Sequence, residues 1–165
     1  MLQKQTKQVN YRKKIWYITA GAGILFILMM GIQYTKRFCQ QQEIAEKILR
    51  FHVIANSDTE ADQNLKLAVR DAVGAKMGTL LADADNRDEC KMIINEQMDQ
   101  IIDTAKQVVV EMGYDYGVQA FLSDVDFPVK TYGNYTFPAG KYEALEVVIG
   151  SGTGRNWWCI MYPNM

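Results

Sequence analysis

The stretch ILRFHVIANSDTEADQNLKLAVRDAV (48–73) changes its hydrophobic period partway along. Up to residue 55 the side chains alternate, with Leu49, Phe51 and Val53 on one face, and this period of two predicts a strand. Ser57 is followed three residues later by Glu60, so we expect Ser57 and Glu60 to form a capping box that starts a helix. The apolar stripe of that helix comprises Leu65, Ala68, Val69, Ala72 and Val73.

The rest of the chain adds a second helical segment and then several strands. Asn86 and Glu89 form another capping box, and apolar residues at helical spacing continue to about Met112. The C-terminal part is rich in aromatic and β-branched residues, and Gly133-Asn134 predicts a tight hairpin turn. We therefore expect an α+β fold, in which an N-terminal transmembrane helix precedes a two-layer domain of two helices packed on a mostly antiparallel sheet.

The N-terminal segment predicts the topology. Residues 15–32 (IWYITAGAGILFILMMGI) carry no charge, and the uncharged run continues to Thr35, long enough to nearly cross a bilayer. Basic residues crowd the segment 1–14, which favours a cytoplasmic N-terminus. We expect a signal anchor at 15–35, a polar helical stalk at 36–47 and an exported domain at 48–165. A cleaved signal peptide is the alternative, although no small-x-small site follows the apolar run.

Charge and composition exclude several classes of function. Residues 36–165 hold 13 basic and all 19 acidic residues, a net charge of −6, which opposes binding to nucleic acid. The single histidine and three cysteines without motif spacing argue against a metal site. We expect no cofactor, no metal and no small-molecule substrate. Of the cysteines, we expect Cys39 to be exposed beside the membrane and Cys159 to be a buried apolar residue.

Two motifs that suggest catalysis have simpler interpretations. GSGTGRN (150–156) resembles a phosphate-binding loop, but a strand-like segment follows it rather than a helix, so we predict a glycine-rich hairpin loop. His52, Ser57 and Asp58 contain the groups of a catalytic triad, but the chain has no G-x-S-x-G motif and Ser57 is assigned to the helix cap. We therefore predict no catalytic residues and expect that the protein is not an enzyme.

Polar residues are unusually dense around the strand-to-helix turn, and exposed ion pairs contribute too little to stability to explain this density. We therefore predict that this cluster binds a partner protein. Trp157 and Trp158, on an aromatic strand, are the second predicted contact surface. The predicted partner-binding residues of the turn and helix are His52, Asn56, Asp58, Gln63, Lys66 and Arg70.

Two long blocks carry a family resemblance. FHVIANSDTEADQNLKLAVRDAV (51–73) and FPVKTYGNYTFPAGKYEALEVVIGSGTGRNWWC (127–159) resemble the stage II sporulation protein R family of endospore-forming bacteria. The resemblance covers about residues 48–162. The family usually continues with a second cysteine, whereas this sequence stops at Met165, so we do not expect Cys159 to form a disulfide with such a partner.

The resemblance implies a signalling function. Members are exported into the intermembrane space between forespore and mother cell, where they activate a membrane-embedded aspartic protease that removes the pro-sequence of sigma-E. The resemblance thus places the protein at the cell membrane with an exported domain, or secreted into that space. An exported cell-wall hydrolase and a carbohydrate-binding module remain the alternatives.

Overall fold

The computed structural model describes the backbone of residues 2–163 and the side chains of residues 16–163. It divides into two compact units, Met1–Gln42 and Glu43–Met165. Helix α1, Leu2–Ala45, forms the first unit and enters the second. Within it, Trp16–Ala45 is long and apolar enough to cross a membrane, and a signal sequence would have the same properties. The predicted stalk continues the apolar segment as one unbroken helix as far as Ala45.

The second unit contains a four-stranded mixed sheet in the order β2-β5-β1-β6. Strand β1 (Leu49–Ile54) is central, parallel to β5 (Gly140–Ile149) and antiparallel to β6 (Asn156–Tyr162). Strand β2 (Val118–Phe127) pairs antiparallel with the outer side of β5. The α+β prediction is confirmed, and two of the three pairings in this sheet are antiparallel.

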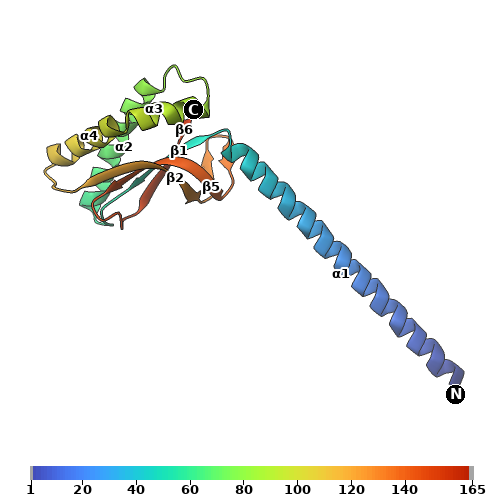
Figure 1. Ribbon diagram of the computed structural model, residues 1–165. Coiled ribbons are helices and arrows are strands. Elements are labelled where there is room, and N and C mark those ends of the chain that lie inside the picture. The colour runs from blue at the N-terminus through green and yellow to red at the C-terminus, as the bar shows by residue number, and fades with distance from the viewer. Residues whose placement is uncertain (1, 164–165) are drawn as a thin grey trace. The chain divides into compact units, whose positions relative to one another are not determined.

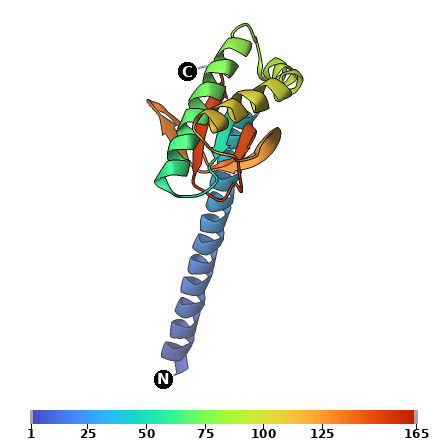
Figure 2. The same ribbon diagram turned by 90° about the vertical axis from the view of Figure 1, so that its left-hand side faces the viewer.

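The helices that follow β1 lie on one side of the sheet (Figure 1; Figure 2 shows the same from another side). They are α2 (Glu60–Leu80), α3 (Arg87–Glu96) and α4 (Met98–Glu111). The second predicted helix is thus two helices separated at Gln97, where the backbone leaves helical geometry. Asn86 caps α3 as predicted, because its side chain accepts a hydrogen bond from the Glu89 backbone N–H.

The predicted cap of α2 is wrong. Thr59, not Ser57, is the N-cap, and its hydroxyl accepts a hydrogen bond from the backbone N–H of Asp62. Glu60 is therefore the first residue of the helix rather than the third, and it takes no part in a capping box with Ser57. Ser57 instead donates its hydroxyl hydrogen to the Asp62 carboxylate at 2.6 Å, so the helix starts two residues later than the motif predicts.

Both faces of β1 are buried, by different elements. Leu49, Phe51 and Val53 face the helices and join one hydrophobic core with side chains of α2, α4 and β5. On the opposite face, residues of β1 meet the hairpin of β3 (Lys130–Tyr132) and β4 (Tyr135–Phe137). Its two-residue turn is confirmed, with Gly133 at a positive φ of 56°.

Burial of the apolar stripe of α2 should govern the stability of the second unit. Leu65 has no exposed surface, whereas Leu67, two residues along the same helix, is 36% exposed. We predict that Leu65→Ala lowers the free energy of unfolding by about 2–5 kcal/mol, because it leaves a cavity in the core. Leu67→Ala is the matched control and should change it by less than about 1 kcal/mol. Chemical denaturation measures both, and equal losses would contradict this assignment of the core.

Candidate functional site

The predicted glycine-rich hairpin loop is instead a crossover. Because β1 lies between β5 and β6, the loop 150–155 must pass over the end of β1, about 10 Å from one strand to the other. Asn56, two residues beyond β1, holds this loop in place. Its backbone C=O accepts hydrogen bonds from the hydroxyls of Ser151 (2.7 Å) and Thr153 (2.8 Å). Its side-chain Oδ1 accepts one from the backbone N–H of Ser151 at 2.9 Å.

The loop approaches the turn so closely that it requires glycine at two positions. Gly150 has φ of 59°, and a Cβ there would collide with the Asn56 side chain. A Cβ on Gly154 would collide with the backbone carbonyl of Ser57. The glycines that suggest a phosphate-binding loop are therefore explained by contact between two segments of the chain itself.

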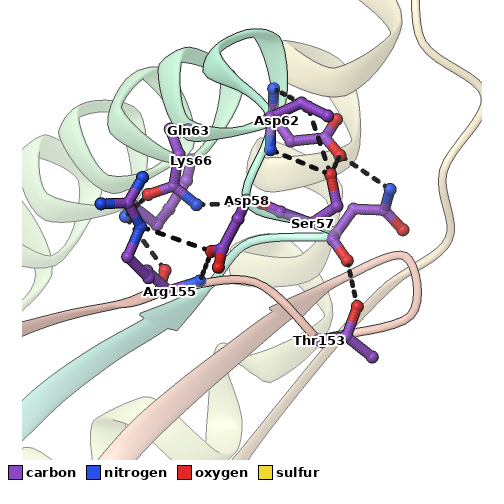
Figure 3. Close-up of polar contacts among 9 residues, drawn as sticks. Ser57, Asp58, Asp62, Gln63, Lys66, Thr153 and Arg155 are labelled. Atoms are coloured by element: carbon purple, nitrogen blue, oxygen red, sulfur yellow. Dashed lines mark hydrogen bonds and ion pairs between the residues drawn. The ribbon is translucent and has the colours of Figure 1, made fainter.

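A carboxylate lies at the centre of the turn (Figure 3). Asp62 is buried, and it accepts hydrogen bonds from the Ser57 hydroxyl at 2.6 Å and from Asn56 Nδ2 at 2.9 Å. These two bonds, led by Ser57, hold the pKa of Asp62 below its usual value. Asp62 therefore stays ionised, and it joins the first turn of α2 to the Asn56 side chain that holds the crossover loop.

Gln63 and Lys66 extend the network toward β6. Gln63 donates from Nε2 to the Ser57 C=O, and Lys66 Nζ donates to Gln63 Oε1 at 2.6 Å and to the Arg155 C=O at 3.0 Å. Burial lowers the pKa of Lys66. Asp58 is the exposed end of the network and accepts from the Arg155 backbone N–H at 2.7 Å. We call these six residues (Asn56, Ser57, Asp58, Asp62, Gln63 and Lys66) the turn clamp.

Arg70 lies outside the turn clamp. Its guanidinium lies 4.9 Å from the centroid of the Trp157 ring and donates to the neighbouring Asp71 carboxylate at 2.7 Å. Arg70 and Trp157 line one end of a groove of about 570 Å³ between α2 and β6. The structure thus brings together these two predicted contact residues from elements far apart in the sequence.

His52 and Trp158 lie on the face of the sheet that the helices do not cover. The two rings stack with centroids 4.0 Å apart and planes 8° apart. His52 Nδ1 lies 3.0 Å from Glu146 Oε2, and desolvation lowers the pKa of His52 to about 4. His52 therefore contacts Glu146 while Ser57 donates to Asp62, so His52, Ser57 and Asp58 do not form a triad.

The sequence patterns do not single out Arg50, the largest fully buried side chain among the described residues. Its guanidinium lies 3.9 Å from the Phe127 ring centroid and 4.9 Å from that of Tyr142, and it donates to the Tyr132 hydroxyl at 3.1 Å. No ion pair joins Arg50 to a carboxylate in the part of the chain whose side chains are described. An arginine inside a β-rich segment, with an aromatic-rich segment elsewhere in the chain, was the available signal for this cation–π contact.

The remaining predictions about side chains concern cysteine and metal ions. Cys39 is exposed as predicted, whereas Cys159 is only partly buried, because β6 lies at the edge of the sheet. In residues 16–163 no three His, Cys, Asp or Glu side chains are grouped so as to hold a metal ion.

Comparison with known proteins gives a consistent match. A protein-family model described as "Stage II sporulation protein R" matches residues 45–165. A curated protein of that description from Bacillus subtilis (strain 168) is 35% identical over 120 residues, which are 73% of this chain and 54% of the relative. The chain therefore spans about half the length of this relative. No solved structure matches the chain.

The environment of His52 predicts an unusual titration. Its folded pKa of about 4 lies below the usual value of about 6.5, so protonation favours the unfolded state. The stabilisation from neutral His52 is complete above about pH 6.5 and is lost as the pH falls toward 4, to a limit of about 3 kcal/mol. NMR of the imidazole Hε1 resonance measures this pKa without ambiguity, because the chain has one histidine. A native midpoint near 6.5 would contradict the stacked, buried position.

Proposed function

The chain belongs to the stage II sporulation protein R family, and on this basis we propose that it is an exported signal that activates a membrane-embedded aspartic protease. Membership implies a role in sporulation. The protease in this proposal removes the pro-sequence of pro-sigma-E in the mother cell. The observation that carries the proposal is the family match over residues 45–165, which takes in the entire sheet and the three helices packed on it.

The proposed topology follows from α1. Its apolar segment holds the N-terminus in the forespore membrane, or directs export and is then removed, and the acidic unit from Glu43 onward works in the intermembrane space. In either case the signalling residues lie outside the cytoplasm of the cell that makes them. In the intermembrane space, a protein made by one cell can contact a protease in the membrane of the other cell.

A protein that catalyses no reaction can activate a receptor if it binds one state of that receptor more tightly than another. A ligand that binds the competent state of a receptor more tightly than the idle state shifts the population toward the competent one. The side chains available for such binding include the exposed Asp58 at the end of the turn clamp and the half-buried Arg70–Trp157 pair beside α2. We propose these as receptor contacts, whereas the buried His52 and Lys66 act by holding the fold.

The proposal is tested by co-expressing the full chain with the receptor protease and pro-sigma-E in a host that does not sporulate. We predict that pro-sigma-E is shortened only when all three are present, and immunoblotting of pro-sigma-E measures this. A receptor whose catalytic aspartate is replaced is the control, and it should abolish processing because the chain supplies no catalytic group. Processing that persists with this inactive receptor would assign the cleavage to the chain itself and overturn the proposal.

A further inference from the structure

The β3–β4 hairpin is joined to the main sheet through two breaks that each contain a proline. Strands β2 and β5 pair as far as Gly140, and pairing resumes two residues later on each side, between β3 and β4. Pro128 lies in one break and Pro138 in the other. Because proline has no backbone N–H to donate, both prolines interrupt the ladder in the same interval. The hairpin therefore forms a separate sheet, attached by two short connections.

Side chains hold the hairpin against the sheet. The Tyr132 hydroxyl accepts a hydrogen bond from Arg50 Nη2 at 3.1 Å and donates one to the backbone C=O of Trp158 at 3.1 Å. Phe137 packs against the apolar cluster that includes Ile48, and its ring centroid lies 5.9 Å from the Arg50 guanidinium. One hydroxyl of the hairpin thus contacts both β1 and β6, and we call the contact between Arg50 and Tyr132 the latch.

The docked position leaves two defects beneath the hairpin. Arg50 Nη1 is buried without a hydrogen-bond partner, and water would supply one if the hairpin lifted. A groove of about 850 Å³ is lined by Tyr132 and Tyr135 of the hairpin and by Ile160 of β6. An isolated two-stranded hairpin is at best marginally stable in water, so β3 and β4 depend on docking for their order. We therefore expect opening of the hairpin to need less free energy than unfolding of the sheet.

We propose that the β3–β4 hairpin is a hinged strap, which opens and closes over Arg50 about Pro128 and Pro138 while the four-stranded sheet stays folded. The latch holds the closed state. In the open state the Arg50 guanidinium loses the Tyr132 hydroxyl and the Phe137 ring, and it becomes accessible to water. The strap thereby switches this face of the sheet between an aromatic surface and a cationic one. This inference is independent of the proposed function, because opening of the strap needs no receptor.

Amide hydrogen exchange of the full chain in detergent measures this opening segment by segment. We predict that residues 130–137 exchange faster than 49–54 and 140–149. Tyr132→Phe removes the hydroxyl of the latch, so it should speed exchange at 130–137 by about tenfold or more and leave 140–149 unchanged. Tyr135→Phe is the matched control, because it makes the same chemical change in the same hairpin at a side chain that is 66% exposed. It should leave exchange within about twofold of the wild type.

A double variant tests the latch itself. Arg50→Lys keeps the positive charge but loses the planar guanidinium, so it should also speed exchange at 130–137. Because both changes break the same contact, Tyr132→Phe added to Arg50→Lys should speed exchange by less than the product of the two single effects. Thermal unfolding verifies that each variant is folded, and the comparison of Tyr132→Phe with Tyr135→Phe decides the proposal if Arg50→Lys does not fold.

Several results would overturn the strap. If 130–137 and 140–149 are equally protected and change in step in every variant, the hairpin opens only when the sheet unfolds. Exchange at 130–137 at the rate of an unstructured chain in the wild type would contradict the closed state. Equal exchange in Tyr132→Phe and Tyr135→Phe would refute the latch. Single effects that multiply in full would assign Arg50 and Tyr132 to separate contacts, and would refute it as well.

Discussion

The hydrogen bonds of Asn56 to the loop 150–155 are the constraint on which the arrangement of the domain depends. They fix the point at which the chain leaves β5, passes over the end of β1 and begins β6. Because this crossover inserts β1 between two strands that are consecutive in the sequence, β1 lies inside the sheet and β6 lies outside it in the strand order. The same residue contacts Asp62 of α2, so strand, helix and loop meet at one side chain.

The polar residues around the strand-to-helix turn were predicted to bind a partner, but the structure also gives most of them a role in holding the fold. The turn clamp satisfies its own polar groups, mostly through hydrogen bonds to backbone or to buried carboxylate, and such bonds each contribute about 1 kcal/mol to stability. The dense polar residues of the turn clamp are therefore explained by hydrogen bonds that hold the fold, whereas exposed ion pairs did not explain them. β6, in contrast, is flanked by two apolar grooves, both lined by Cys159 and Ile160.

Local patterns predicted the elements well, and non-local pairing explains most of the errors. The alternation at 48–55, the helix after the turn, the Asn86 cap and the Gly133-Asn134 hairpin were all predicted correctly. Neighbouring strands usually pair with each other, so the loop after β5 was predicted to be a hairpin, but β1 occupies that place. Thr59 rather than Ser57 caps the helix, because the Ser57 hydroxyl donates to the carboxylate of Asp62, a residue that is not part of the capping-box motif.

Candidate site residues were harder to assign, because burial depends on what covers each face. Nothing in the run LRFHVI shows that Tyr132 contacts Arg50 from 82 positions later or that Trp158 covers His52, although burial of His52 determines its charge. Arg70 and Trp157 were each selected from the sequence, but their contact across the α2–β6 groove is visible only in the fold.

The central claim is that the turn clamp, apart from its exposed end at Asp58, holds the fold while other residues contact the receptor, and Asn56→Ala tests it most directly. We predict that this variant loses about 1–3 kcal/mol of unfolding free energy, because partners of the side chain lose their hydrogen bonds. Pro-sigma-E processing should be measured on the same variant across temperature and expressed per folded molecule. The account predicts wild-type processing at temperatures where the variant is folded. Unchanged stability with processing lost at every temperature would contradict it and would make Asn56 a receptor contact.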